Sequence, residues 1–175
     1  MDAIIRAATA EDIPAIAQIY ADIHTEEEAG RAQIGWNRAI YPTEQTAWTA
    51  LQAGDLFVLS ENGEVCAAAC INRTQVPAYV QAHWHWQAND DEVMVLHTLV
   101  VAPKRAGCGI ASRFVAFYED YAGAHGCPVL RMDTNERNRA ARSLYRKLGY
   151  READVVPCIF NGIPDVKLVC LEKKL

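Results

Sequence analysis

The chain has 175 residues, 51% of them hydrophobic and 22% charged, and its net charge is −5 at pH 7. This length is typical of one domain with a buried core, so we expect a single domain over residues 1–175. The negative charge argues against a nucleic-acid partner, because phosphate binding needs a basic surface. The first residues contain no long apolar run, which argues against a signal peptide or a membrane partner.

Six cysteines are scattered along the chain without a CxxC pair. This spacing argues against a zinc ribbon and against a thioredoxin-like redox site. Reduced thiols in the cytoplasm are the simplest interpretation, so we expect a cytoplasmic protein.

The first 54 residues predict a strand and two helices. Residues 3–8 are typical of a short strand, and Thr9 followed by Asp12 forms a capping box at the start of the first helix. An irregular segment over residues 24–42 comes next. A second helix is then expected over residues 43–54, because a threonine suited to the N-cap opens it and a glycine ends it.

The irregular segment contains the acidic run Glu26–Glu28 and two large aromatic residues. The acidic run is either a solvated helix face or a rim that attracts a cationic amine. Trp36 and Tyr41 either wall a pocket or pack into the core. We expect Trp36 to contribute to a substrate site.

Residues 56–71 predict two strands joined by the Asn-Gly dipeptide at positions 62 and 63, the strongest short signal for a hairpin. The loop that follows, residues 72–91, is long, polar and aromatic, and we interpret it as a lid or as part of an acceptor site. It contains His83 and His85, but no further cluster of ligands accompanies them. We therefore expect no metal.

The stretch from Val93 to Ala111 is the one around which the chain is organised. Its first part predicts a central strand over residues 93–101, apolar on both faces. Strict alternation puts Val93, Val95, Leu99 and Val101 on one face and Met94, Leu96 and Val100 on the other. A glycine turn and a helix over residues 109–126 follow. The next strand, residues 129–133, is expected to run parallel, because a helix crosses over between the two strands.

A helix over residues 138–149 and a terminal antiparallel hairpin over residues 150–171 complete the predicted order β-α-α-β-β-β-α-β-α-β-β. We therefore expect an α/β (mixed α+β) fold, with one central mixed sheet flanked by helices.

The turn Gly107-Cys108-Gly109 lies between a strand and a helix, an arrangement that forms anion sites because the free N–H groups of a helix start point at negative charge. A Walker loop is excluded, since no Gly-Lys-Ser/Thr ending is present. A dinucleotide fingerprint lacks its third glycine and lies too far from the first strand. The remaining interpretation is the pyrophosphate loop of an acyl-CoA-dependent transferase.

Two motifs resemble those of the GNAT superfamily of N-acetyltransferases. The first, V-x-P followed by Q/R-x-x-G-x-G/A, has one departure, Ala106 in place of the usual Gln or Arg. Its matching residues are Val101, Pro103, Gly109 and Ala111. The second, N-x-x-A-x-x-L-Y-x-K-x-G-F/Y, is matched at every marked position by NRAARSLYRKLGY over residues 138–150. The resemblance covers residues 3–172 and implies the GNAT fold.

The resemblance also implies acetyl-CoA as co-substrate. It implies that the strand edge at Leu99 and Val101 binds the pantetheine arm, that Asn138 contacts the CoA, and that Tyr145 donates a proton or hydrogen bond to the departing thiolate. Tyr145 also lies on an apolar helix stripe, so a core position is the alternative. The turn residues expected to hold the CoA are Ala106, Gly107, Cys108, Gly109, Ile110 and Ala111, with positive charge from Lys104 and Arg105.

The base that takes the proton of the amine is left open by the sequence. His97 lies on the central strand and titrates near neutral pH, although a buried structural histidine is the alternative. Arg131 and Asp133 are two residues apart on a strand and therefore share a face. They form either an ion pair or an acceptor site, in which Asp133 binds the amine or acts as the base and Arg131 binds a carboxylate.

We therefore expect an N-acetyltransferase that moves the acetyl group of acetyl-CoA to a primary amine of a small molecule or amino-acid-like acceptor by direct attack. The alternative is a non-catalytic acyl-CoA-binding sensor or regulatory domain, which keeps the glycine turn without turnover. A homodimer is the default expectation for a small enzyme.

Overall fold

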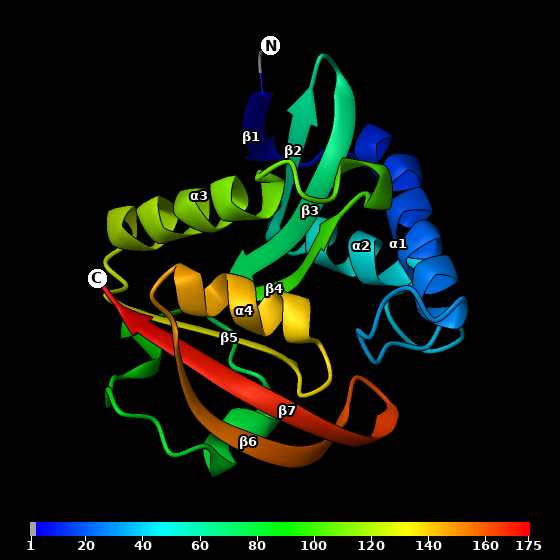
Figure 1. The fold of residues 1–175 in the computed structure, drawn as a ribbon. Helices are drawn as coiled ribbons and strands as arrows, with labels where there is room; N and C mark the ends of the chain where they lie inside the picture. The colour runs from blue at the N-terminus through cyan, green and yellow to red at the C-terminus, as the bar shows by residue number, and fades with distance from the viewer. Residues whose placement is uncertain (1–2) are drawn as a thin grey trace.

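The sheet has seven strands in the order β1-β2-β3-β4-β5-β7-β6, and only β4 and β5 are parallel neighbours (Figure 1). The computed structural model describes residues 3–175, so the first two residues of the expected domain lie outside it. The strands are β1 (Ala3–Ala7), β2 (Leu56–Glu61), β3 (Glu64–Asn72), β4 (Val93–Val101), β5 (Val129–Asn135), β6 (Arg151–Phe160) and β7 (Ile163–Lys174). The helices are α1 (Ile13–Glu28), α2 (Glu44–Gln52), α3 (Ile110–Ala124) and α4 (Arg139–Lys147).

The predicted order of elements and the mixed α/β class are confirmed. The terminal hairpin is longer than expected, since β6 continues to Phe160 and β7 begins at Ile163. The connection is the two-residue turn Asn161-Gly162, and both residues have positive φ, 48° and 85°. Such a turn matches the twist of the flanking strands and lets pairing continue to its edge.

Helices cover both faces of the sheet (Figure 1). On one face, α1 and α2 pack on β2, β3 and the end of β4, with Ile16 and Val58 fully buried in the shared cluster. On the other face, α3 and α4 pack on the central strands, and the buried Tyr118 hydroxyl donates to the carbonyl of Met94 at 2.6 Å. No helix within residues 3–175 is both long and apolar enough to cross a membrane.

Strand β4 contains a β-bulge at Thr98. The φ of this residue is 52°, in the left-handed region. The register with β3 shifts between Ala68 and Cys70, so that Thr98 and Leu99 together lie opposite the single residue Ala69. A bulge of this kind places one extra residue in the strand and shifts the alternation of its side chains by one.

This shift makes the face assignment of the second half of β4 wrong. Leu99 and Val101 pack in the cluster that contains Leu96, although strict alternation placed them with Val95. Val100 packs in the opposite cluster, beneath α1 and α2. The physical reason is the left-handed residue, which no periodicity of apolar residues reveals.

The long loop before β4 is fastened to the sheet by Glu172 of β7, whose side chain is fully buried. Its carboxylate accepts the backbone N–H groups of His85 at 2.7 Å and Trp86 at 3.3 Å. It also accepts the guanidinium of Arg151 at 2.9 Å. A buried carboxylate with three donors stabilises the loop because none of its partners is left unpaired.

We expect Glu172→Ala to lower the free energy of unfolding by about 2–3 kcal/mol, because it leaves two part-buried N–H groups without an acceptor and Arg151 without its partner. Urea denaturation measures this change. The matched control is Glu136→Ala, since Glu136 makes a partly exposed ion pair of 3.8 Å with Lys167, and a loss below about 0.5 kcal/mol is expected. Equal losses in the two variants would contradict this account of the loop.

Candidate active site

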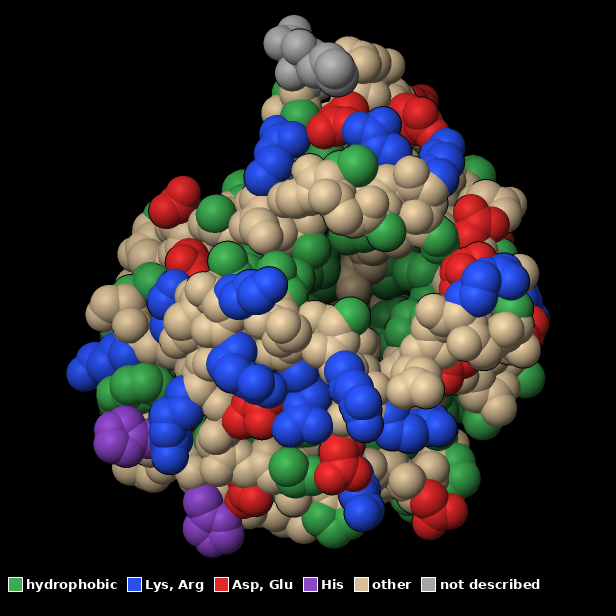
Figure 2. Space-filling model, viewed as in Figure 1, with side chains coloured by type: hydrophobic (Ala, Val, Ile, Leu, Met, Phe, Trp, Pro, Cys, Tyr) green, Lys and Arg blue, Asp and Glu red, His purple; other side chains and the backbone are tan. Residues whose placement is uncertain are grey.

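A cavity of about 360 Å³ lies where β4 and β5 separate. The ladder between these strands ends at the pair Leu96–Met132, and the rest of β4 has no partner on the β5 side. In Figure 2 the surface is hollowed beside α4, with hydrophobic side chains inside the hollow. The predicted site residues that line the cavity are Trp36, Leu99, Val101, Ala106, Asp133, Asn138 and Tyr145.

The glycine turn lies just beyond the Ala106 end of this cavity. Gly107 and Gly109 have φ of 77° and 74°, and Gly109 is the N-cap of α3. Within residues 3–175, no acceptor occupies the backbone N–H of Gly109, Ile110 or Ala111. Unpaired N–H groups at a helix start make an anion site. Ala106 lines the cavity, but the other residues predicted to hold the CoA here do not: Gly107, Cys108, Gly109, Ile110 and Ala111.

Lys104 and Arg105, which were expected to supply positive charge here, already have carboxylate partners. Lys104 pairs with Glu64, and Arg105 pairs with the nearly buried Glu61. Their charge is therefore largely compensated within the protein.

Tyr145 and Asn138 reach the cavity from α4. Tyr145 is 8% exposed, and its hydroxyl makes no hydrogen bond to the part of the chain that the structure describes. Burial raises the pKa of this phenol above its ordinary value, so the hydroxyl keeps its proton. Asn138 is the N-cap of α4, and its side-chain oxygen accepts the N–H of Ala141 at 3.2 Å.

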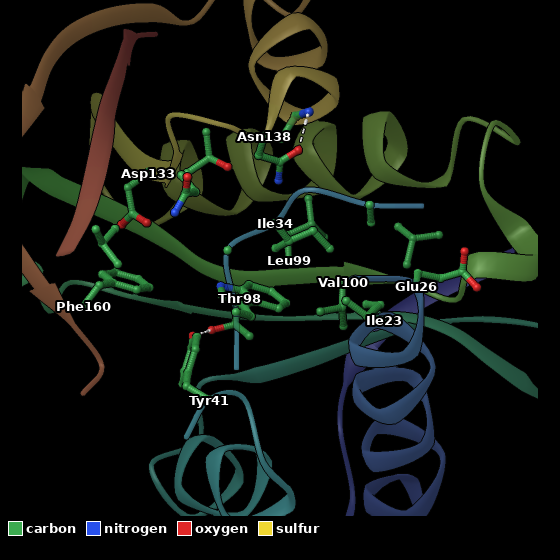
Figure 3. Close-up of a pocket in the computed structure, with 18 of the residues that line it drawn as sticks. Ile23, Glu26, Ile34, Tyr41, Thr98, Leu99, Val100, Asp133, Asn138 and Phe160 are labelled. Carbon is green, nitrogen blue, oxygen red and sulfur yellow. Dashed lines mark hydrogen bonds between the residues drawn. The ribbon is translucent and has the colours of Figure 1, made fainter. Parts of the chain in front are cut away.

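Asp133 brings a carboxylate into the cavity just beyond Met132, the last residue of β5 that pairs with β4. The Tyr79 hydroxyl donates to its Oδ2 at 2.6 Å. Burial raises the pKa of Asp133 to about 6, and the hydrogen bond from Tyr79 opposes this shift. Figure 3 shows Asp133 and Phe160 at one end of the cavity and Glu26 at the other, with Leu99 between them. A carboxylate poised near neutrality can take up a proton at physiological pH.

Three aromatic rings wall the Asp133 end. The rings of Trp36 and Tyr41 meet edge to face with centroids 5.7 Å apart, and those of Tyr41 and Phe160 do so at 5.9 Å. The Tyr41 hydroxyl is hydrogen-bonded to Thr98 Oγ1. Phe160 and Thr98 line the cavity although sequence reasoning did not select them. The Asn-Gly turn next to Phe160 was a sequence signal that could have selected this residue. No sequence signal marked Thr98.

The loop that carries Trp36 is held across the opening by Glu27. Its carboxylate accepts the N–H groups of Ile34 at 2.5 Å and Gly35 at 3.0 Å. Gly35 has a φ of 81°, and a Cβ at this position would lie 2.3 Å from Asn135 Nδ2. Only glycine therefore lets the loop approach the end of β5 this closely.

His97 does not line this cavity. It faces a second, more open hollow, where its Nε2 lies 2.8 Å from Asn72 Oδ1. Burial lowers the pKa of His97 to about 4, so the imidazole is neutral at physiological pH. The hydrogen bond to Asn72 and the weakened capacity to hold a proton fit a structural histidine better than a base.

Arg131 is also outside the cavity, and no ion pair joins it to Asp133 within the described part of the chain. Its guanidinium donates to the side chain of Gln75 at 2.5 Å and to the carbonyl of Trp86 at 3.1 Å. It also lies 4.2 Å above the ring of Trp84. Arg131 therefore fastens the loop over residues 72–91 and is not directed at a ligand.

The two histidines of that loop do not form a metal cluster. His83 Nδ1 lies 2.7 Å from Asp154, and the ring of His85 packs edge to face on Trp86. Over residues 3–175 no three potential metal-ligating side chains come together.

A split between parallel strands, open N–H groups at the adjacent helix start and a tyrosine facing the split suit a long anionic ligand. The chain belongs to the acetyltransferase (GNAT) family, whose model matches residues 13–150. Members of this family use acetyl-CoA.

Known N-acetyltransferases resemble this chain in sequence or in fold. A 60-residue segment is 38% identical to an uncharacterized N-acetyltransferase, YhfO, of Bacillus subtilis strain 168, and the alignment covers 34% of this chain and 40% of that relative's length. A GNAT-family acetyltransferase structure from Streptococcus agalactiae 2603 superposes with a TM-score of 0.82 at 21% identity, over 99% of this chain and 95% of that one. The structure of yncA from Salmonella typhimurium, with its cofactor acetyl-CoA, gives a TM-score of 0.70 at 21% identity, over 100% and 95%. The two structures show a common fold.

We expect Asp133→Asn to raise the free energy of unfolding at pH 7.5 by about 1–2 kcal/mol, because the wild type keeps a half-buried charge that the amide lacks. Below pH 6 the folded wild type binds a proton that the unfolded chain binds only near pH 4, so this advantage shrinks as the pH falls. Thermal and urea unfolding of both proteins between pH 4 and 8 measure it.

The control for this prediction is Asp154→Asn. The pKa of Asp154 is lowered, chiefly by the hydrogen bond from His83, so the ionised form is the favoured one and no stabilisation at pH 7.5 is expected. A stability gain in Asp133→Asn that does not change with pH would contradict the raised pKa.

Proposed function

We propose that residues 1–175 form an N-acetyltransferase domain that transfers the acetyl group of acetyl-CoA to the primary amine of a small molecule by direct attack. The observation that carries the proposal is the continuity of the cavity. It begins at Ala106 beside the glycine turn, follows the unpaired edge of β4, and reaches both Tyr145 and Asp133. One cavity therefore contains a strand edge suited to holding the donor, a carboxylate suited to taking a proton and a phenol suited to giving one.

The donor end supports binding of CoA. The open N–H groups at the start of α3 suit the pyrophosphate. The unpaired edge of β4 at Leu99 and Val101 suits the pantetheine arm, and a backbone N–H in this stretch serves as the oxyanion donor. Asn138 is placed to contact the CoA. Lys and Arg side chains gather along the front face near α4 (Figure 2), and Arg137 and Arg139 make no ion pair within residues 3–175.

Asp133 is the base in this proposal, since it lines the cavity and His97 does not. Above pH 6 its carboxylate is ionised, holds the ammonium form of the acceptor and takes one proton from it. Acetyl-CoA supplies the thioester: the nitrogen–carbon bond forms at the acetyl carbonyl and the carbon–sulfur bond breaks. Tyr145 donates its proton to the departing thiolate and regains one from the amide nitrogen. Asp133 then returns its proton to solvent.

We expect acetyl-CoA to bind the wild type and Gly109→Trp to weaken that binding by about 100-fold, since the indole would fill the anion site. Isothermal calorimetry measures the affinity. Gly126→Trp is the control, because Gly126 lies just after α3, has a similar φ of 71°, and also has open space around its Cα. Absence of wild-type binding, or equal affinities of all three proteins, would remove the donor site from the proposal.

We expect Tyr145→Phe to lower kcat by about 100-fold while the affinity for acetyl-CoA stays unchanged, because the leaving thiolate loses its proton donor. Thiol release with a panel of amines measures kcat. Tyr150→Phe is the matched control, since Tyr150 packs edge to face on Tyr145 but donates to Glu119 at 3.0 Å, outside the cavity. Acetyl-CoA binding with no thiol release from any amine would favour the sensor alternative.

A further inference from the structure

We propose that the acceptor is an arylalkylamine: a primary amine on a short chain that ends in an aromatic ring and bears no carboxylate. The inference rests on the proposed function and specifies its substrate class. It revises the amino-acid-like acceptor that Arg131 suggested from the sequence.

The shape of the acceptor end favours an aromatic group. Trp36 and Tyr41 come from the segment between α1 and α2, and Phe160 comes from the end of β6, so two separate parts of the chain bring their rings to one place. Val166 and Leu168 of β7 complete this wall, and both are nearly buried. An edge-to-face arrangement leaves ring faces and edges available to a further ring, which aromatic groups prefer as a partner.

The charge of the acceptor end favours an amine without a carboxylate. The charged residues that line the cavity are Glu26, Arg31 and Asp133. Arg31 is bound to Glu26 through two hydrogen bonds of 2.8 and 2.9 Å, and Glu26 lies at the end opposite Asp133 (Figure 3). Asp133 is therefore the single charged group at the acceptor end.

The carboxylate of Asp133 has one oxygen left for the amine. Tyr79 donates to Oδ2, and within residues 3–175 no hydrogen bond reaches Oδ1. An ammonium group on Oδ1 gains a charge-assisted hydrogen bond. A substrate carboxylate nearby would face this anion at an end of the cavity that no cation among residues 3–175 lines, and a like charge in a low-dielectric site is strongly unfavourable.

Arg131, the one cation on the same face of β5, cannot relieve this repulsion. Its guanidinium is already held by Gln75, by the carbonyl of Trp86 and by the ring of Trp84. Recruiting it to a substrate would break these contacts with the loop over residues 72–91, the loop that also carries the Tyr79 hydroxyl on Asp133.

The experiment compares matched pairs of acceptors that differ by one carboxylate: 2-phenylethylamine with L-phenylalanine, and tryptamine with L-tryptophan. Thiol release at saturating acetyl-CoA gives kcat/KM for each. We expect the decarboxylated member to be preferred by about 100-fold or more, because the other member places an unpaired anion beside Asp133. Equal or better use of the amino acids would overturn the inference, as would exclusive use of aliphatic amines.

Failure of the inference is distinguishable from failure of the proposed function. Turnover of other amines together with no turnover of arylalkylamines overturns the arylalkylamine class alone. Binding of acetyl-CoA without turnover of any amine overturns the proposed enzyme, and the substrate class falls with it.

A pair of neighbouring variants tests the aromatic wall directly. We expect Phe160→Ala to lower kcat/KM for 2-phenylethylamine about 10- to 100-fold, to change that for ethylamine little, and to leave acetyl-CoA affinity intact. Ile159→Ala is the control, because Ile159 is 74% exposed and lies outside the cavity. Equal losses with both amines would show a merely structural role for Phe160 and would overturn the aromatic site.

Discussion

Thr98 is a β-branched residue held at a φ of 52°, a conformation that costs of order 1–2 kcal/mol, in the middle of a sheet. The hydrogen bond between its Oγ1 and the Tyr41 hydroxyl helps to hold it there. The bulge turns Leu99 and Val101 toward α3, while His97, just before it, faces the opposite hollow. It also lies beyond the end of the ladder with β5, so it coincides with the unpaired edge that borders the cavity. The strained residue Thr98 thus separates two halves of the sheet. In the closed half β4 pairs with β5, and in the open half it does not.

The same boundary explains why Arg131 and Asp133 differ so much, although they share a strand and a face. The last residue of β5 that pairs with β4 is Met132, which lies between them. Arg131 belongs to the closed half, and its guanidinium is already bound by the loop over residues 72–91. Asp133 belongs to the open half, where Tyr79 of that loop is the one side-chain donor to its carboxylate within residues 3–175. The loop over residues 72–91 connects Arg131 with Asp133, since the groups that fasten this loop also fix the position of Tyr79.

Local patterns were enough to predict the order of the elements, the parallel crossover and the helix starts, because each depends on neighbours in sequence. The strand pattern selected Asp133, and the resemblance to the GNAT superfamily selected Tyr145 and Asn138; the structure brings these three residues to one cavity. The side-chain directions in the second half of β4 could not be predicted, since a single positive φ leaves no pattern. Nor could the role of Arg131, because it depends on Gln75 and Trp86, which are distant in sequence. Glu172, in a charged C-terminal segment, gave no sign that it is fully buried.

In the proposed site, the segment between α1 and α2 brings Trp36 and Tyr41 to the acceptor end, whereas the glycine turn and α4 contribute to the donor end. The two ends are thus encoded by separate parts of the chain. Under the proposed function, substitutions at positions 36 or 160 would alter which acceptor fits and leave the residues of the two family motifs unchanged. Such a division allows new specificities to evolve in a descendant gene while the inherited chemistry is retained.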